Sequence, residues 1–170
     1  MTSFYLRPAT LSDAETIAAL HVAVWRQTYR HLAPPHAVAT LTEAYRLPLW
    51  QARIREALAD SPVIVAEQAG RIAGFGAGML QAPPVYEGRA EIGSLYVAPD
   101  VKRQGLGRLL LEHVKALLLA QGARGVGLGV VRGNDPAIAF YQAMGGRIAG
   151  AYVDPGKHWR SDNLLMVFDA

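Results

Sequence analysis

A glycine turn with basic neighbours stands directly before a long amphipathic stretch, in the segment PDVKRQGLGRLLLEHVKALL, Pro99 to Leu118. Gly105 and Gly107 let a backbone approach a ligand closely, and the first N–H groups of a helix are unpaired and carry positive partial charge. The cations around this turn are Lys102, Arg103 and Arg108. Such a turn can hold one phosphate group. The alternative is that the glycines only make a tight connection from a strand to a helix.

Two other phosphate motifs fit this turn poorly. A dinucleotide fingerprint needs a third glycine where Leu110 stands, and an acidic residue near Gln121 and Gly122, where none is found. A P-loop needs the ending Gly-Lys-Ser/Thr, which the chain lacks. Nicotinamide and ATP chemistry are therefore both disfavoured.

The composition of the chain is that of a compact globular protein. The chain has 170 residues, of which 51% are apolar and 18% charged, so we expect one compact domain over residues 1–170. The net charge is +3 without basic blocks, and we expect no nucleic-acid partner. The chain has no cysteine, and its five histidines lack metal-binding spacing, so no disulfide, thiolate nucleophile or metal is expected.

The ends and the hydropathy of the chain point to one compartment. The first ten residues, MTSFYLRPAT, contain no apolar leader core. No stretch approaches the roughly 18 apolar residues of a membrane span. We therefore expect a soluble, cytoplasmic protein without a membrane partner.

The hydrophobic pattern predicts a mixed α/β order of elements. The expected strands are Phe4–Arg7, Val63–Gln68, Ile72–Leu80, Ala90–Val97, Val126–Val131, Arg147–Val153 and Leu164–Phe168. The expected helices are Ser12 to about Gln27 behind a Ser12/Glu15 capping box, His36–Ala44, Pro48 to about Ala59, the helix after the glycine turn, and Asp135–Gly145. In the fourth strand, simple alternation places Leu95 and Val97 on the side of Glu91.

Two motifs in this order resemble the GNAT superfamily of N-acetyltransferases. The run Lys102-Arg103-Gln104-Gly105-Leu106-Gly107 is similar to the family's acetyl-coenzyme A motif, Arg/Gln-x-x-Gly-x-Gly/Ala, which also follows a strand and a Pro-containing turn. Downstream, NDPAIAFYQAMGG matches a second family motif through Asn134, Phe140 and Tyr141. The opening LRPATLSDAETIAALHVAVWRQTY resembles the family's first strand and helix, so the likeness covers nearly the whole chain. Lys102 and Gly146 depart from the pattern, where Arg or Gln and an aromatic residue are usual.

The resemblance implies a fold, a reaction and a coenzyme site. It implies a strongly twisted mixed sheet flanked by helices on both faces, and transfer of an acetyl group from acetyl-CoA to a primary amine. The pyrophosphate of coenzyme A would lie on the N–H groups from about Arg103 to Arg108, and the pantetheine arm would lie between the strand Ala90–Val97 and the strand Val126–Val131. The implied coenzyme-binding residues are Leu95, Tyr96, Val97, Lys102, Arg103, Gln104, Gly105, Leu106, Gly107, Arg108, Asn134 and Phe140.

Acetyl transfer needs a base, an oxyanion donor and an acid. Tyr141 matches the tyrosine that many family members use to protonate the leaving thiolate, since a phenol with a pKa of about 10 is protonated at neutral pH. Its alternative role is that of a core aromatic. Glu91 is the candidate base if its strand is buried, because burial raises the pKa of a carboxyl group. The alternatives are a solvent-facing Glu91 and an ordered water as base. A backbone N–H between Leu95 and Val97 is the candidate oxyanion donor.

The acceptor amine is the least determined part of the hypothesis. By resemblance, the first helices and the loop after Leu80 cover its site, and the candidate residues are Trp25, Tyr29, Tyr86 and Glu87. A polyamine, an amino acid, an aminoglycoside and a protein amine all suit this scaffold. A non-catalytic acyl-CoA-sensing module is the alternative function, and a homodimer is possible because family members commonly dimerise.

Overall fold

The computed structural model describes residues 3–169, and its centre is one seven-stranded sheet in the order β1-β2-β3-β4-β5-β7-β6. The strands are β1 (Tyr5–Pro8), β2 (Val63–Gln68), β3 (Arg71–Met79), β4 (Ala90–Val97), β5 (Gly125–Val131), β6 (Arg147–Val153) and β7 (Asp162–Asp169). All neighbours pair antiparallel except β4 and β5, which are parallel. The predicted mixed sheet is confirmed. The prediction that the first ten residues contain no leader core lies partly outside the described residues, since it includes Met1 and Thr2.

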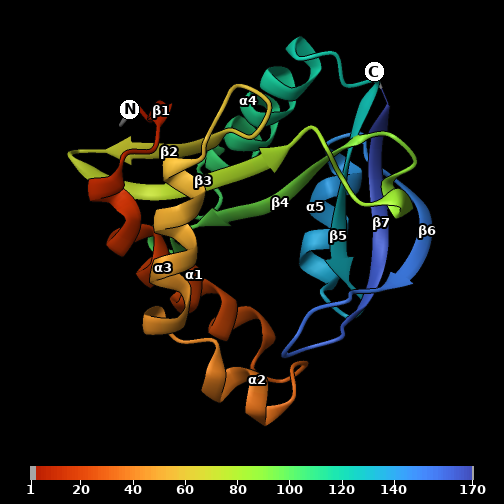
Figure 1. The fold of residues 1–170 in the computed structure, drawn as a ribbon, viewed down its shortest axis with the longest axis horizontal. Coiled ribbons are helices and arrows are strands. Elements are labelled where there is room, and N and C mark those ends of the chain that lie inside the picture. The colour runs from red at the N-terminus through yellow and green to blue at the C-terminus, as the bar shows by residue number, and fades with distance from the viewer. Residues whose placement is uncertain (1–2, 170) are drawn as a thin grey trace.

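Helices cover both faces of this sheet (Figure 1). On one face, α1 (Ala14–Tyr29) and α3 (Glu43–Arg55) pack on β2 and β3 through a cluster that includes Ile17, Trp50 and Phe75. On the other face, α4 (Leu106–Ala120) and α5 (Asp135–Ala143) close a second cluster with β4, β5 and β7. The short helix α2 (Pro35–Thr40) lies beyond the end of α1.

Helix α4 lies unusually close to β3, because three glycines of that strand face it. A Cβ atom at Gly74 would lie 3.2 Å from side-chain atoms of Leu106 and of Leu110. A Cβ atom at Gly78 would lie 2.8 Å from Leu118, and one at Gly76 would lie 3.1 Å from Val114. The apolar face of α4 therefore packs on the strand backbone itself.

The first helix begins differently from the prediction. The predicted Ser12/Glu15 capping box is wrong: Thr10 and Asp13 make the cap, and the Thr10 N–H donates to Asp13 Oδ2 at 2.7 Å. Asp13 is held there by Arg7, whose guanidinium also contacts Glu67 on β2. Asp13 is thus fixed by Arg7, whose own position is set by Glu67 on the neighbouring strand, and this favours the cap formed by Thr10 and Asp13.

The predicted second and third helices are also displaced. The segment His36–Ala44 is not one helix, because α2 ends at Thr40 and Thr42 caps α3 by accepting from the Tyr45 N–H at 3.2 Å. Pro48 therefore lies inside α3 instead of starting it. Thr42 is a good N-cap residue, and it decides the start of α3.

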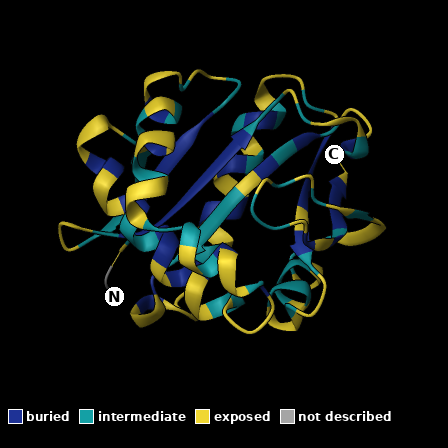
Figure 2. Ribbon diagram, turned by 60° about the horizontal axis from the view of Figure 1, so that its bottom comes forward, coloured by how far each residue is buried: buried dark blue, intermediate teal, exposed yellow. Residues whose placement is uncertain are grey.

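Burial follows the layers of the fold. Figure 2 shows buried residues concentrated on the strands at the centre and exposed residues on the outward faces of the helices. Strand β6 is an exception, since it is an edge strand with almost all of its residues exposed. Among residues 3–169, no helix has the length and apolar character that crossing a membrane requires.

Candidate active site

Strand β4 contains a bulge that decides which of its side chains face the site. Ala77 pairs with Ser94 and Gly78 with Ile92, so Gly93 is an extra residue without a partner on β3. Because a bulge reverses the alternation of side chains, Leu95 and Val97 face α4, opposite to Glu91. The predicted shared side for these three residues is therefore wrong. Glu91 instead shares its face with the ring of Tyr96.

Beyond the bulge, β4 and β5 separate. The two strands pair only at Ala90 and Glu91, and Figure 1 shows them diverging from that point. The Ala98 N–H donates to the Ala73 carbonyl on β3 at 2.8 Å. Because hydrogen-bonded pairs alternate along an antiparallel ladder, the N–H groups of Leu95 and Val97 point toward the opening, whereas that of Tyr96 points to β3. The opening therefore has two backbone donors on its β4 side.

The glycine turn lies at the end of this opening. Lys102 N–H donates to Pro99 and Leu109 N–H donates to Gly105, but the N–H groups from Arg103 to Arg108 have no backbone partner among the described residues. Gly105 has φ +84° and open space around a would-be Cβ atom, so the turn leaves its backbone accessible. This arrangement suits a phosphate group.

The side chains of the turn divide into two kinds. Leu106 is fully buried in the core, so only its backbone is available to a ligand. Lys102, Arg103, Gln104 and Arg108 are exposed. Arg108 pairs with Glu112 at 2.9 Å, while no ion pair is found for Lys102 or Arg103 within the described chain. The two free cations can therefore meet an anion at the turn.

The second motif packs against the first. A Cβ atom at Gly107 would lie 3.3 Å from the Phe140 ring, so α5 touches the first turn of α4. Asn134 is the residue before α5, yet its side chain makes no capping hydrogen bond; its Nδ2 donates to the Tyr29 hydroxyl at 3.3 Å. The two predicted motifs are thus brought together, and Asn134 connects them to α1.

Tyr141 lies in the layer of α4 and α5 and contacts Phe168 with ring centroids 6.5 Å apart. A Cβ atom at Gly146 would lie 2.8 Å from Phe168, so the Phe168 ring packs directly against Gly146 behind α5. Burial, together with the nearby Tyr29, raises the pKa of Tyr141 well above its usual value of about 10. The phenol is therefore a proton donor throughout the neutral range.

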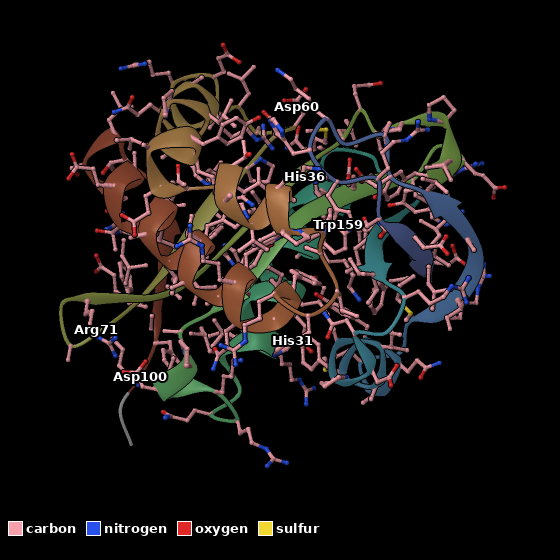
Figure 3. The ribbon with its side chains drawn as sticks, turned by 90° about the horizontal axis from the view of Figure 1, so that it is seen from below. His31, His36, Asp60, Arg71, Asp100 and Trp159 are labelled. Atoms are coloured by element: carbon pink, nitrogen blue, oxygen red, sulfur yellow. The ribbon has the colours of Figure 1, made fainter. Side chains whose placement is uncertain are left out.

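A cavity of about 310 Å³ lies on the other face of the sheet. Its walls come from α1, α3, β4, β5 and the loop between β6 and β7. That loop is anchored to α2, since a ring nitrogen of His36 is 2.8 Å from the His158 carbonyl oxygen. Figure 3 shows His36 and Trp159 on adjacent segments. The cavity is thus closed by segments from opposite ends of the chain.

Glu91 lines this cavity at the point where β4 and β5 separate. Tyr86 donates its hydroxyl proton to Glu91 Oε1 at 2.9 Å, and the Tyr152 hydroxyl lies 3.3 Å from that of Tyr86. Burial raises the pKa of the Glu91 carboxyl, the hydrogen bond from Tyr86 lowers it, and nearby Asp154 raises it again. A partly buried carboxylate with a raised pKa suits a general base.

Three of the four residues predicted to bind the acceptor line the cavity, and one does not. Trp25, Tyr29 and Tyr86 all line the cavity. Glu87 does not: its side chain is 74% exposed, in contact with Arg89 at 3.5 Å. Glu87 has a left-handed backbone and begins the turn into β4, so its side chain points away from the cavity.

Sequence reasoning missed several lining residues. Arg46 and Tyr45 of α3 face the cavity, as do Asp154 and Trp159 of the β6–β7 loop. The polar composition of that loop gave no sign of its partner across the cavity. Arg46 lies in α3, whose start was predicted at Pro48, so Arg46 was placed between two helices. Among the described residues, no group of three or more His, Asp or Glu side chains gathers to hold a metal ion.

Comparison with known proteins identifies a family and a relative with a similar sequence. Residues 25–146 match the model of the acetyltransferase (GNAT) family. The chain is 30% identical over 140 residues to an uncharacterized N-acetyltransferase, YuaI, of Bacillus subtilis (strain 168), covering 81% of this chain and 77% of that protein.

Two solved structures share the whole fold. The PaiA N-acetyltransferase of Thermoplasma acidophilum, in complex with coenzyme A, aligns with a TM-score of 0.78 at 20% identity over 99% of both chains. YncA of Salmonella typhimurium, described as a putative acetyltransferase and solved with its cofactor acetyl-CoA, aligns with a TM-score of 0.72 at 21% identity, over 99% of this chain and 94% of that one. The chain belongs to the acetyltransferase (GNAT) family.

Proposed function

We propose that this chain is a single-domain N-acetyltransferase that moves an acetyl group from acetyl-CoA to an amine in a ternary complex. The observation that carries the proposal is the continuity of the site: the unpaired N–H groups from Arg103 to Arg108 lead into the opening between β4 and β5, and Glu91 lies at its inner end. A relative and two solved structures with the same fold are N-acetyltransferases or acetyltransferases by name, two of them with coenzyme A or acetyl-CoA bound.

The chain's own groups fit coenzyme A. The backbone from Arg103 to Arg108 and the side chains of Lys102 and Arg103 would hold the pyrophosphate, with Phe140 packed against the same helix end. The backbone of Leu95 and Val97 and the Asn134 amide would hold the arm along the opening. When bound, acetyl-CoA supplies a thioester carbonyl as the acetyl donor.

Three groups of this chain would then act on the reacting atoms. The Glu91 carboxylate takes the proton of the acceptor ammonium, directly or through a water, because an ammonium is no nucleophile. The Leu95 or Val97 N–H donates to the oxyanion as the new C–N bond forms. Tyr141 gives its proton to sulfur as the C–S bond breaks. The chain has no cysteine, so no acyl-cysteine intermediate interrupts the transfer.

A thermal melt with acetyl-CoA, with NADH and ATP as controls, tests the coenzyme part of the proposal. A ligand at about 100 times its Kd adds about 2.7 kcal/mol of stability, which corresponds to about 5–10 °C for a domain of this size. A shift with acetyl-CoA alone supports the site. The absence of any shift with acetyl-CoA contradicts it.

Thiol release in the presence of amines tests the catalytic part. Glu91→Gln and Tyr141→Phe should each lower kcat by at least about a hundredfold while the acetyl-CoA melting shift remains. A chain that binds acetyl-CoA but releases no thiol with any amine would instead be the alternative, an acyl-CoA-sensing module. The homodimer, the cytoplasmic location and the absence of a metal stay predictions.

A further inference from the structure

Arg46 lies in the wall of the cavity with its charge unmatched. Its Nε atom is buried and has no hydrogen-bond partner within the described part of the chain. No carboxylate of residues 3–169 lies within 4.0 Å of its guanidinium. A charged group that leaves water without a partner loses much solvation free energy. The site therefore lacks an anion at Arg46.

The guanidinium is nevertheless held in place. Its central carbon lies 5.7 Å from the centroid of the Trp25 ring, a cation–π contact that keeps the planar group against the cavity wall. Burial lowers the pKa of Arg46, but an arginine stays charged at any physiological pH. The planar guanidinium of Arg46 is therefore already positioned in the absence of a ligand.

The same cavity holds two carboxylates without an ion pair, Glu91 and Asp154, although Arg53 lies near enough to Glu91 to lower the pKa of its carboxyl group. Glu91 accepts only the Tyr86 hydroxyl, and Asp154 Oδ1 accepts the Gly156 N–H at 2.8 Å. Neither carboxylate forms an ion pair with a cation of the described chain. The negative charges come from β4 and from the segment after β6. The positive charges come from Arg46 on α3 and from Lys157, which belongs to the same loop as Asp154; Lys157 is exposed, whereas Arg46 is half-buried in the wall.

We propose that the acceptor is a small amino acid, with its amine at Glu91 and Asp154 and its carboxylate on Arg46. This inference rests on the proposed function and narrows its substrate class. A carboxylate matches the fork of a guanidinium with two parallel hydrogen bonds. The volume of about 310 Å³ suits a small molecule. A polyamine would leave Arg46 unmatched and bring further positive charge into the same cavity.

The test compares each acid with its own neutral amide. Glycine, leucine and phenylalanine are each paired with the corresponding carboxamide, and spermidine is added as a cation without an acid group. Thiol release is measured with acetyl-CoA, and rates are expressed per concentration of free-base amine, because the amides are less basic than the acids. A charge-assisted hydrogen bond contributes enough that we expect kcat/KM to favour the acid by about 10- to 100-fold in at least one pair.

Variants assign that preference to Arg46. Arg46→Gln should bring the ratio of acid to amide close to one by raising KM for the acid, and Arg46→Lys should restore part of the ratio. Arg55→Gln is the matched control, because it removes the same charge from the exposed side of α3 and should keep the wild-type ratio. If Arg46→Gln fails to fold, the wild-type ratio still decides the question.

The outcomes separate the two proposals. Equal or better use of the amides or of spermidine by the wild type overturns the amino-acid inference and leaves the transferase intact. An unchanged ratio in Arg46→Gln overturns the role of Arg46. If no amine releases thiol, the transferase proposal fails. The amino-acid inference is then decided by the melting shift that leucine, but not leucinamide, should give in the presence of coenzyme A.

Discussion

Removing the hydroxyl of Tyr86 should move the pH dependence of the reaction. Tyr86 is 2% exposed, and its hydroxyl donates to Glu91 Oε1 at 2.9 Å. In Tyr86→Phe the ring keeps its packing against Gly127, where a Cβ atom would lie 2.8 Å from it, and only the donor is lost. The perturbation is therefore confined to the two hydrogen bonds of this hydroxyl, with Glu91 and with Tyr152.

The magnitude follows from the strength of that bond. A hydrogen bond to an ionised group is worth about 1.5–3 kcal/mol, and 1.36 kcal/mol corresponds to one pKa unit. Because the bond stabilises the carboxylate, its loss raises the pKa of Glu91 further above its ordinary value. A base must be ionised to accept a proton, so the acid limb of kcat/KM should move to higher pH, by an amount that corresponds to the free energy of the lost bond.

The assay is the rate of thiol release at low acceptor concentration, measured from about pH 5 to about pH 9. The ionisation of the acceptor amine is the same in all variants and cancels from the difference. Tyr152→Phe is the control, because its hydroxyl lies 3.3 Å from that of Tyr86 and contacts Glu91 only through it, so its limb should move less. A Tyr86→Phe limb that coincides with the wild type would show that Glu91 is not the base.

Two further changes test other parts of the molecule. His21 is buried and accepts the Trp50 indole N–H at 3.0 Å, and burial lowers its pKa to about 3. On acidification, the imidazole of His21 binds a proton in the unfolded chain near pH 6.5 but in the folded protein only near pH 3. The free energy of unfolding should therefore fall by about 5 kcal/mol between these two pH values. Urea titrations at several pH values should find a smaller fall in His21→Gln. Gly105→Ala places a side chain on a left-handed backbone, although the new Cβ atom would touch no neighbour. The substitution should lower the melting midpoint by about 2–8 °C and weaken coenzyme binding. Gly150→Ala, where the backbone is not left-handed, is the control and should do neither.

The order of elements and the glycine turn were predictable because each depends on neighbours in the sequence. The apolar spacing of α4 and the short apolar runs of β2 and β3 are local patterns, and the strands lie close to their predicted limits. The turn before α4 carries its own conformational signal in Gly105. The two motifs that predicted the coenzyme site are likewise short and contiguous.

The face of β4 and the wall of the cavity could not be predicted in this way. The bulge at Gly93 arises from the register with β3, and it reverses the side on which Leu95 and Val97 lie. Arg46 and Asp154 meet in one cavity although 108 positions separate them, so neither had a local sign of the other. Such contacts depend on packing between distant segments.

The glycines of β3 set the distance between the sheet and α4, including the end of α4 that follows the glycine turn. Because Gly74, Gly76 and Gly78 have no side chains, α4 packs directly on the backbone of β3, and these glycines determine the distance between helix and sheet. A methyl group at Gly76 would lie 3.1 Å from the Val114 side chain, so Val114 or the helix that carries it would have to shift by a few tenths of an ångström. We expect a shift of the helix to displace the N–H groups from Arg103 to Arg108 and to lower the affinity for the coenzyme from a position inside the protein.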